Sequence, residues 1–258
     1  MYIKTLLRPI LCLFLLCTTV PSYSQTKFVE LRREISSFNN TRCVNQEFNA
    51  HAPLFDVSDN KSILNSVNDS IYQIVSLVMR TMNEDVSFKD NNWQVDKKGI
   101  DECEGGINNI ENRSLGYEVL FNENNILSVM LRHDWIIEKQ NSPNSDPEVA
   151  EQQTAYCFSV DVASNKILDV NSLFSESNKV LFIDKIKEKY TKEFNEELSQ
   201  AGDRAQFSGI LLRFDTVLAV YTLKLPNNES AIRIIEIPLS EVKDLMDPNY
   251  VEKLKTVK

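Results

Sequence analysis

A strand that leads into one long amphipathic helix, between residues 154 and 199, constrains the fold of this chain more than any other stretch. Apolar side chains alternate with small or polar ones from Tyr156 to Val162, which is the period of a strand with one buried face. After a turn and the apolar pair Ile167 and Leu168, apolar residues recur at steps of three and four over residues 178–199, and charged residues fill the opposite side. We therefore predict strands within 155–168 and a helix at 178–199.

Similar patterns elsewhere predict a second helix and more strands. Apolar residues at helical spacing predict a helix over residues 60–82. Two alternating runs, 115–121 and 126–137, predict a hairpin whose asparagine-rich turn tolerates left-handed backbone geometry. Three further strands are expected between residues 207 and 239. Short connections favour antiparallel pairing, so the predicted fold class is α+β: an antiparallel β-sheet with two long amphipathic helices packed on one face.

The segments that connect these elements are expected to be irregular. Residues 139–153 contain two prolines and no apolar period, which predicts a loop, and such loops often carry binding sites. Ser240 is expected to cap a short helix that ends before Pro248, and the residues that follow are expected to form a polar tail.

Trp93, Lys139 and Gln140 are the candidate binding residues. Trp93 lies in the polar connector that follows the first predicted helix, where an exposed ring could stack on a sugar. Lys139 and Gln140 begin the proline-containing loop. The other tryptophan, Trp135, lies on the apolar face of its strand and is expected to belong to the core.

The first 24 residues predict a cleaved secretory signal peptide. Lys4 and Arg8 form a basic segment, residues 10–20 are apolar, and Ser22-Tyr23-Ser24 is a small-x-small cleavage site. An uncleaved anchor is disfavoured because a membrane span needs about 20 apolar residues. Lipidation of Cys17 is disfavoured because the bulky Leu16 precedes it. The mature chain, residues 25–258, is expected to be a single exported domain, periplasmic or extracellular, without a transmembrane segment; a subdivision into 25–140 and 154–250 is the alternative.

The mature chain is acidic. Removing the signal peptide takes away two cationic residues and no acids, so the formal net charge goes from -9 to -11. A strongly negative chain without a lysine or arginine cluster is a poor partner for nucleic acid or for an anionic membrane. The charge is expected to serve solubility, with attraction of a cationic partner as the alternative.

Three cysteines follow the predicted cleavage site: Cys43, Cys103 and Cys157. One disulfide is expected in an oxidising compartment, and Cys43 with Cys103 is the favoured pair because both lie in polar, turn-rich segments whereas Cys157 lies within a strand. The other two pairings and three free thiols stay open. No CxxC motif occurs, so neither a thioredoxin-type site nor a zinc ribbon is predicted.

No sequence motif for catalysis or for a cofactor is recognisable. His51 and His133 lie in unrelated segments without the spacing of a metal site, and GxSxG and phosphate-binding glycine motifs are absent from the sequence. Adjacent acids such as Asp101 and Glu102 are typical of solvated surface charge. Paired carboxylates for glycoside cleavage would need a cleft that spacing cannot show. We therefore expect no cofactor, no metal and no catalytic residue.

Three runs occur in an order that resembles a known domain: GYEVLFNENNILSVMLRHDW at 116–135, AYCFSVDVASNKILDVNSLF at 155–174 and IIEIPLSEVKDLM at 234–246. The known domain is the extracytoplasmic domain, of uncharacterised function, that RsiV-type anti-sigma factors and PdaC-type peptidoglycan deacetylases share. The resemblance spans about residues 45–250 by element order and implies a domain beside the cell wall. Two loops depart from that family, at residues 136–140 and 221–228, so neither lysozyme sensing nor deacetylase activity is expected to carry over.

The sequence therefore predicts an exported, non-catalytic binding or sensing module of the bacterial cell envelope. Its partner is expected to be cell-wall glycan or an extracytoplasmic protein, and not nucleic acid. Two alternatives stay open: a hydrolase that uses carboxylates in a cleft, and an assembly subunit that binds a protein partner through an exposed edge strand.

Overall fold

The computed structural model describes residues 28–29, 37–41, 44–55, 62–80, 84–89, 92–97, 109–139, 146–201, 205–225 and 229–255. Its strands are β1 (Phe28–Val29), β2 (Ser37–Thr41), β3 (Val44–Ala50), β4 (Leu54–Phe55), β5 (Glu84–Lys89), β6 (Asn92–Lys97), β7 (Asn109–Glu123), β8 (Ile126–Lys139), β9 (Glu148–Asp161), β10 (Lys166–Ile167), β11 (Ala205–Arg213), β12 (Thr216–Lys224) and β13 (Ser230–Pro238). Its helices are α2 (Ser62–Arg80), α3 (Val170–Leu173), α4 (Glu176–Ala201), α5 (Leu239–Val242) and α6 (Pro248–Leu254). Within these residues no helix is long and apolar enough to cross a membrane.

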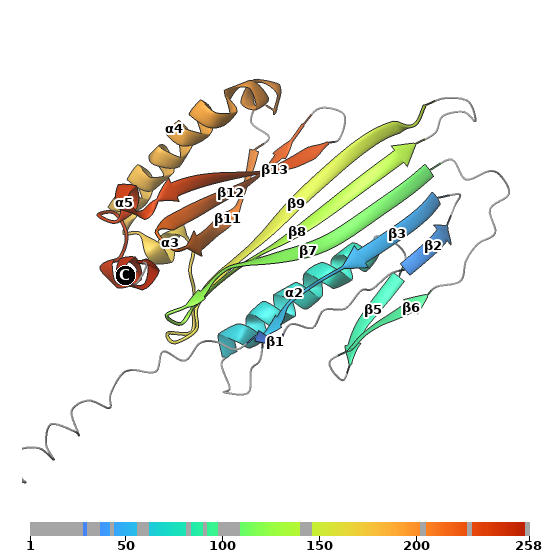
Figure 1. Ribbon diagram of the computed structural model, residues 1–258, viewed down its shortest axis with the longest axis horizontal. Helices are drawn as coiled ribbons and strands as arrows, with labels where there is room; N and C mark the ends of the chain where they lie inside the picture. Colours follow the sequence, from blue (N-terminus) through green and yellow to red (C-terminus); the bar gives the residue numbers. More distant parts are fainter. Residues whose placement is uncertain are drawn as a thin grey trace, which may run out of the picture.

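Six strands form the larger sheet, in the order β10-β9-β8-β7-β3-β2. Neighbouring strands are antiparallel, except that β3 and β7 are parallel. The turn between β7 and β8 places Asn124 and Asn125 at φ values of 54° and 62°, as a two-residue type I′ hairpin requires. The asparagine turn predicted from the sequence is therefore confirmed, although both strands run further than predicted (Figure 1).

Helix α2 covers one face of the larger sheet. Its apolar stripe includes Leu64 and Ile71, which are fully buried against Leu127, Val129 and Leu131 of β8. These three β8 residues are spaced by two, so they point to the same face of the sheet. The helical stripe and the strand alternation that the sequence shows therefore meet in one core.

The three-stranded sheet, β11-β12-β13, covers the opposite face of β8 and β9. Met130 and Ala155 from the larger sheet pack against Leu211, Leu218 and Val220 from the smaller one. Four layers result: α2, the larger sheet, the smaller sheet and then α4, which lies on the far side of the smaller sheet (Figure 1).

A chain of hydrogen bonds joins the two sheets at their contact. The Leu212 amide donates to Ser128 Oγ at 2.8 Å, the two hydroxyls of Ser128 and Ser159 lie 2.9 Å apart, and Ser159 Oγ donates to the Ile210 carbonyl at 3.0 Å. Both serines are buried. The hydroxyls therefore satisfy backbone groups of β11 that have no partner strand on this side.

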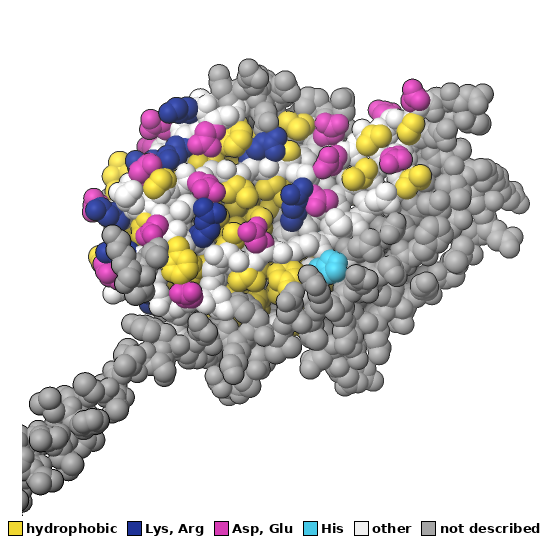
Figure 2. Space-filling view, in the orientation of Figure 1, with side chains coloured by type: hydrophobic (Ala, Val, Ile, Leu, Met, Phe, Trp, Pro, Cys, Tyr) yellow, Lys and Arg dark blue, Asp and Glu magenta, His cyan; other side chains and the backbone are white. Residues whose placement is uncertain are grey.

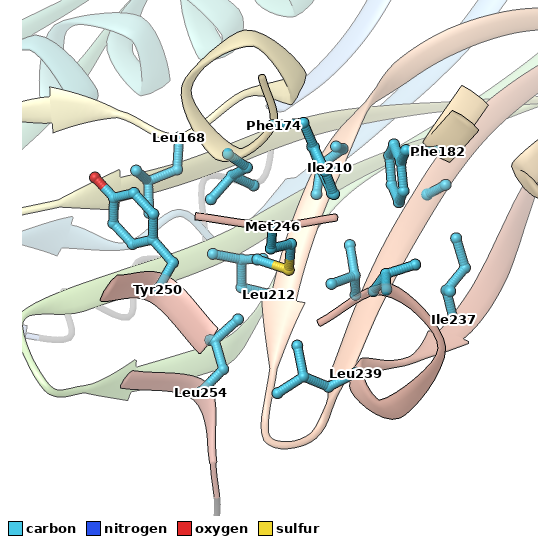
Figure 3. Close-up of a cluster of buried hydrophobic side chains, with 14 of the residues drawn as sticks. Leu168, Phe174, Phe182, Ile210, Leu212, Ile237, Leu239, Met246, Tyr250 and Leu254 are labelled. Atoms are coloured by element: carbon cyan, nitrogen blue, oxygen red, sulfur yellow. The ribbon is translucent and has the colours of Figure 1, made fainter. Parts of the chain in front are cut away.

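The outer face of the smaller sheet carries a third core, which Figure 3 shows in close-up. From α4, Phe182 stacks on Phe174 with ring centroids 4.1 Å apart, and Ile186 is buried beside it. Helix α4 loses regular geometry at Phe194, where φ is -124° and ψ is 26°. The C-terminal helices α5 and α6 complete this core.

The predicted fold class, one antiparallel sheet with two long helices packed on one face, is wrong. The structure is mostly antiparallel β-sheet divided into two principal sheets, and helices α2 and α4 pack on different sheets (Figure 1). The error has a physical cause: Ser128, Cys157 and Ser159 read as the solvent face of their strands, but the second sheet covers them. Small side chains allow this close contact without showing an apolar period.

Two further expectations are corrected. Residues 139–153 are not all loop, because β9 begins at Glu148 and continues the pairing with β8 as far as Lys139. The expected polar tail contains helix α6, in which Asp247 caps the amide of Asn249 and Pro248 occupies the first turn. Tyr250, Val251 and Leu254 are its buried residues.

Candidate functional site

A groove of about 680 Å³ opens between α2, one edge of β9 and the first residues of β11. We call it the β9 groove. Its lining residues come from four elements and are Ser70, Gln73, Ile74 and Leu77 of α2, Thr154, Ala155, Tyr156, Cys157 and Phe158 of β9, Gln206, Phe207 and Ser208 of β11, and Thr222 and Lys224 of β12. The groove is thus the opening between two layers of the fold, along the margin of the larger sheet.

Among the described strands, none pairs with the backbone of β9 along this groove. The amide of Gln153 donates to Ser230 Oγ and the Ser159 carbonyl accepts from Leu168, so the backbone groups of both residues point away from β8. The register between β8 and β9 is continuous, so every second residue between them has the same orientation. Ala155 and Cys157 therefore direct their N–H and C=O groups into the groove, and among the described strands none pairs with them there.

Strand β10 occupies the adjacent position for only two residues. It pairs Lys166 and Ile167 with the end of β9, and the chain then turns into helix α3. Asp169 causes this turn because its side chain accepts from the Ser172 amide, while Ser172 Oγ accepts from the Asp169 amide, a reciprocal capping box. The early cap removes the chain from the edge of β9 and leaves that edge open.

Strand β11 forms the opposite wall of the groove through a close approach to Cys157. Gly209 has a φ of 150°, and a Cβ atom built on it would lie 2.8 Å from the Cys157 Cβ, so glycine is required here. The pairing of β11 with β12 shifts by one residue between Phe207 and Gly209. Burial raises the pKa of the Cys157 thiol to about 12, so the thiol is neutral and packed at physiological pH.

The rim of the groove is apolar and its lining is almost uncharged. Leu77 of α2 is 58% exposed and Phe207 of β11 is 41% exposed, on the two sides of the opening. Among the described residues that line the groove, Lys224 alone carries a charge. Ser230, which pairs with Lys224 across β12 and β13, donates its hydroxyl to the Gln153 carbonyl at 2.9 Å, next to the groove residue Thr154.

A second depression, of about 440 Å³, lies on the larger sheet beyond the edge of the smaller one. It contains the ionisable residues His51, Glu118, Arg132 and Asp134, around the backbone of Gly116. Arg132 Nε donates to Asp134 Oδ1 at 2.8 Å, so this carboxylate is engaged by a cation. A second carboxylate, Glu118, lies in the same depression. A hydrolase that uses two carboxylates would therefore have its candidate pair, Glu118 and Asp134, here.

A buried polar cluster lies on the α2-facing side of the larger sheet. The guanidinium carbon of Arg113 lies 4.0 Å from the centroid of the Trp135 ring, and Arg113 pairs with Glu111 at 3.3 Å. Burial, assisted by the charge of Arg113, lowers the pKa of His133 to about 4, so this imidazole is neutral at physiological pH. His133 lies on the apolar side of β8, as the alternation predicts, and we assign the cluster to packing.

The candidate residues chosen from the sequence are not brought together. Lys139 is exposed at the end of β8, opposite Glu148 and outside the groove lining. Trp93 lies in β6, but its side chain is outside the described residues, as are Gln140 and the predicted disulfide pair Cys43 and Cys103. The described residues contain no group of three histidine, cysteine or acidic side chains that could hold a metal ion.

Sequence reasoning missed the groove residues, although one signal was present. Leu77 falls outside the apolar stripe of its helix, and a large apolar side chain off that stripe indicates an exposed contact. The open edge of β9 had no local signal, because a strand with one free edge has the same alternation as a paired one.

Comparison with solved structures identifies the fold. A member of the DUF3298 family from Bacteroides fragilis matches with a TM-score of 0.53 and 12% identity, over 89% of this chain and 98% of that chain. The chain has a DUF3298-type fold. A DUF3298 protein from Pseudomonas aeruginosa matches with a TM-score of 0.47 and 9% identity, over 84% of this chain and 94% of that chain.

The DUF3298-type fold corrects part of the sequence-based resemblance. It agrees with an uncharacterised domain, but it does not support the naming after RsiV-type or PdaC-type proteins. No family model matches the sequence, and no curated protein matches it either.

Proposed function

We propose that this protein is an exported, non-catalytic binding module of the bacterial cell envelope that holds its ligand in the β9 groove. The observation that carries the proposal is the groove itself: an opening of about 680 Å³ that combines an apolar rim with backbone groups of β9 that no described strand pairs with. Concave sites that join apolar surface to a few polar groups are the usual form of a ligand site.

The chemistry of the groove favours binding over catalysis. General acid–base catalysis needs a titratable pair within reach of the reacting group, and Lys224 is the single charged residue among the described residues of the lining. Burial keeps the Cys157 thiol protonated, so it is not prepared to act as a nucleophile. These features support a site that retains a ligand without changing it.

The export part of the proposal rests on residues 1–24, whose basic start, apolar run and small-x-small site are typical of a secretory signal. On the face shown in Figure 2, acidic and basic side chains are interspersed with apolar ones. Such a mixed surface is unlike the single-sign surface that selects nucleic acid, which supports a glycan or protein ligand.

The proposal is tested with residues 25–258 carrying an affinity tag. The protein is incubated with purified peptidoglycan and, separately, with the secreted protein fraction of the source bacterium, and both retention and release of soluble wall fragments are measured. We expect retention of one of the two without release. Release of wall fragments, or retention of neither, would contradict the proposal.

Matched substitutions locate the site. Leu77→Glu places a charge on the rim of the groove, whereas Leu181→Glu places one on α4 at a nearly equal exposure, 58% against 55%. We expect Leu77→Glu to weaken retention at least tenfold and Leu181→Glu to change it less than twofold. Equal effects would show that the ligand binds elsewhere.

A further inference from the structure

We infer that the occupant of the β9 groove is an extended polypeptide segment with a carboxylate, which pairs with the open edge of β9 in line with β10. The inference rests on the proposed function, because it names the ligand class of the same groove. It is carried by three features of the described residues: the unpaired backbone of Ala155 and Cys157, the position of the groove between two layers, and the single cation Lys224.

The backbone geometry requires a partner with alternating donors and acceptors. Ala155 and Cys157 each present one N–H and one C=O to the groove, and buried backbone groups of this kind are satisfied in almost all folded proteins. Ala155 is only 5% exposed, so bulk water reaches it poorly. A peptide strand supplies donors and acceptors at the matching spacing, whereas a glycan does not repeat at that spacing.

The stretch of β9 that lines the groove lies in line with β10. Strand β10 already pairs with β9 at Val160 and Asp161, and the chain leaves this line after Leu168. The five β9 residues from Thr154 to Phe158 line the groove, which corresponds to roughly 16 Å of extended chain. An incoming segment would therefore continue the line of β10 for about five residues.

The groove is recessed between two covering layers. Helix α2 covers one side of the opening and the start of β11 covers the other, with Leu77 and Phe207 projecting at the rim. The β9 edge of a second copy is flanked by that copy's own α2 and β11, which would have to fit between Leu77 and Phe207. The recessed edge thus selects an extended segment over the β9 edge of another copy.

The side chains of the walls specify an alternating pattern. On the α2 side Ile74, Leu77 and Phe158 form an apolar area beside the polar Ser70 and Gln73. On the β11 and β12 side Ser208, Thr222 and Lys224 make the lining mainly polar, with Phe207 at the rim. Successive residues of a strand point to opposite sides, so the segment should alternate apolar with hydroxyl or acidic residues. Lys224 forms no ion pair among the described residues, so an acidic residue of the segment can complement it.

The test selects linear twelve-residue peptides from a phage-displayed library on residues 25–258, and measures their binding by fluorescence anisotropy. We expect enriched peptides that alternate apolar with polar residues and contain an acid. Leu77→Glu and Phe207→Glu should each weaken binding at least tenfold, while Leu181→Glu and Ile110→Glu, at matched exposures, should change it less than twofold. Lys224→Glu should lower the affinity for the acidic peptide at least fivefold and raise it for the same peptide with lysine instead.

Backbone methylation separates strand addition from other modes of binding. N-methylation of two alternate peptide nitrogens should abolish binding, while methylation of the two intervening nitrogens should not. If all methylated peptides bind equally, strand addition is overturned although the groove stays the binding site. If no peptide is enriched but wall glycan is retained in a Leu77-dependent manner, this inference fails and the proposed function stands. Dimerisation that Leu77→Glu abolishes, measured by sedimentation, would replace the peptide by a second copy.

Discussion

Removing the Ser128 hydroxyl tests the contact between the two sheets. In Ser128→Ala the Leu212 amide loses its acceptor, 2.8 Å away, in a place where Ser128 is 0% exposed and water cannot replace it. A buried amide left without a partner costs about 1–3 kcal/mol. With the middle of this range, about 2 kcal/mol, and a shift of about 2–4 °C per kcal/mol for a chain of this size, we expect a melting temperature about 4–8 °C lower.

The assay is thermal unfolding followed by circular dichroism, with Ser66→Ala as the control. Ser66 donates to the carbonyl of Ser62 on the exposed side of α2, so its removal should change the free energy of unfolding by less than about 0.5 kcal/mol. Because Ser128 and Ser159 bond to each other, the double alanine variant should lose less stability than the two single losses together. A Ser128→Ala melting temperature within 1 °C of the control would refute the reasoning.

Three other predictions concern a buried histidine, a buried ion pair and a constrained glycine. The pKa of His133 is about 4 in the folded protein and ordinarily 6.5, so the free energy of unfolding should fall by up to about 3 kcal/mol as pH drops through this window. In His133→Gln, the free energy of unfolding measured from pH 4 to 7 should lose this part of its pH dependence, and an equal pH dependence in both proteins would disprove the prediction. Lys253 pairs with the buried Asp161 at 2.7 Å, so Lys253→Met should destabilise by about 1.5–3 kcal/mol, and a neutral result in urea unfolding would contradict the pairing. Gly209→Ala should cost about 1–3 kcal/mol, whereas Gly116→Ala, with open space around its Cβ, should cost nothing; equal melting temperatures would show that Gly209 is not constrained.

The carboxylate of Asp161 shows why that ion pair matters for acid stability. Burial alone would raise the pKa of Asp161, but the hydrogen bonds from Lys253 and Ser164 outweigh burial and keep the pKa below its ordinary value. A carboxyl with a depressed pKa stabilises the fold above its unfolded pKa and loses that contribution as pH falls. The pair also ties α6 to the end of β9.

Local patterns of the sequence predicted the elements well but not their layers. The periodicity around Ile71 and Ile186 located both major helices, and the asparagines at 124 and 125 located the hairpin turn. The second sheet was missed because its contact with the first uses Ser128 and Ser159, whose hydroxyls resemble surface residues. The Leu212 amide lies 84 residues from Ser128 and the Ile210 carbonyl lies 51 residues from Ser159, so no local periodicity in the sequence predicts these contacts.

The candidate site was even less accessible from the sequence. Whether the edge of β9 is open depends on where β10 stops, and a capping box at Asp169 and Ser172 decides this. The sequence shows that motif as the start of a helix. It does not show that the same motif ends β10 and so leaves the neighbouring edge of β9 open. Leu77 was the one local sign of an exposed contact.

Amide hydrogen exchange along β9, measured by NMR on residues 25–258, tests the open edge most directly. The amides of Tyr156 and Phe158 point to β8, whereas those of Ala155 and Cys157 point into the groove. The account predicts that Ala155 and Cys157 exchange faster than Tyr156 and Phe158 in the free protein, and slow down when a selected peptide is bound. Equal protection of all four amides in the free protein would show that the edge is already paired, and would contradict the account.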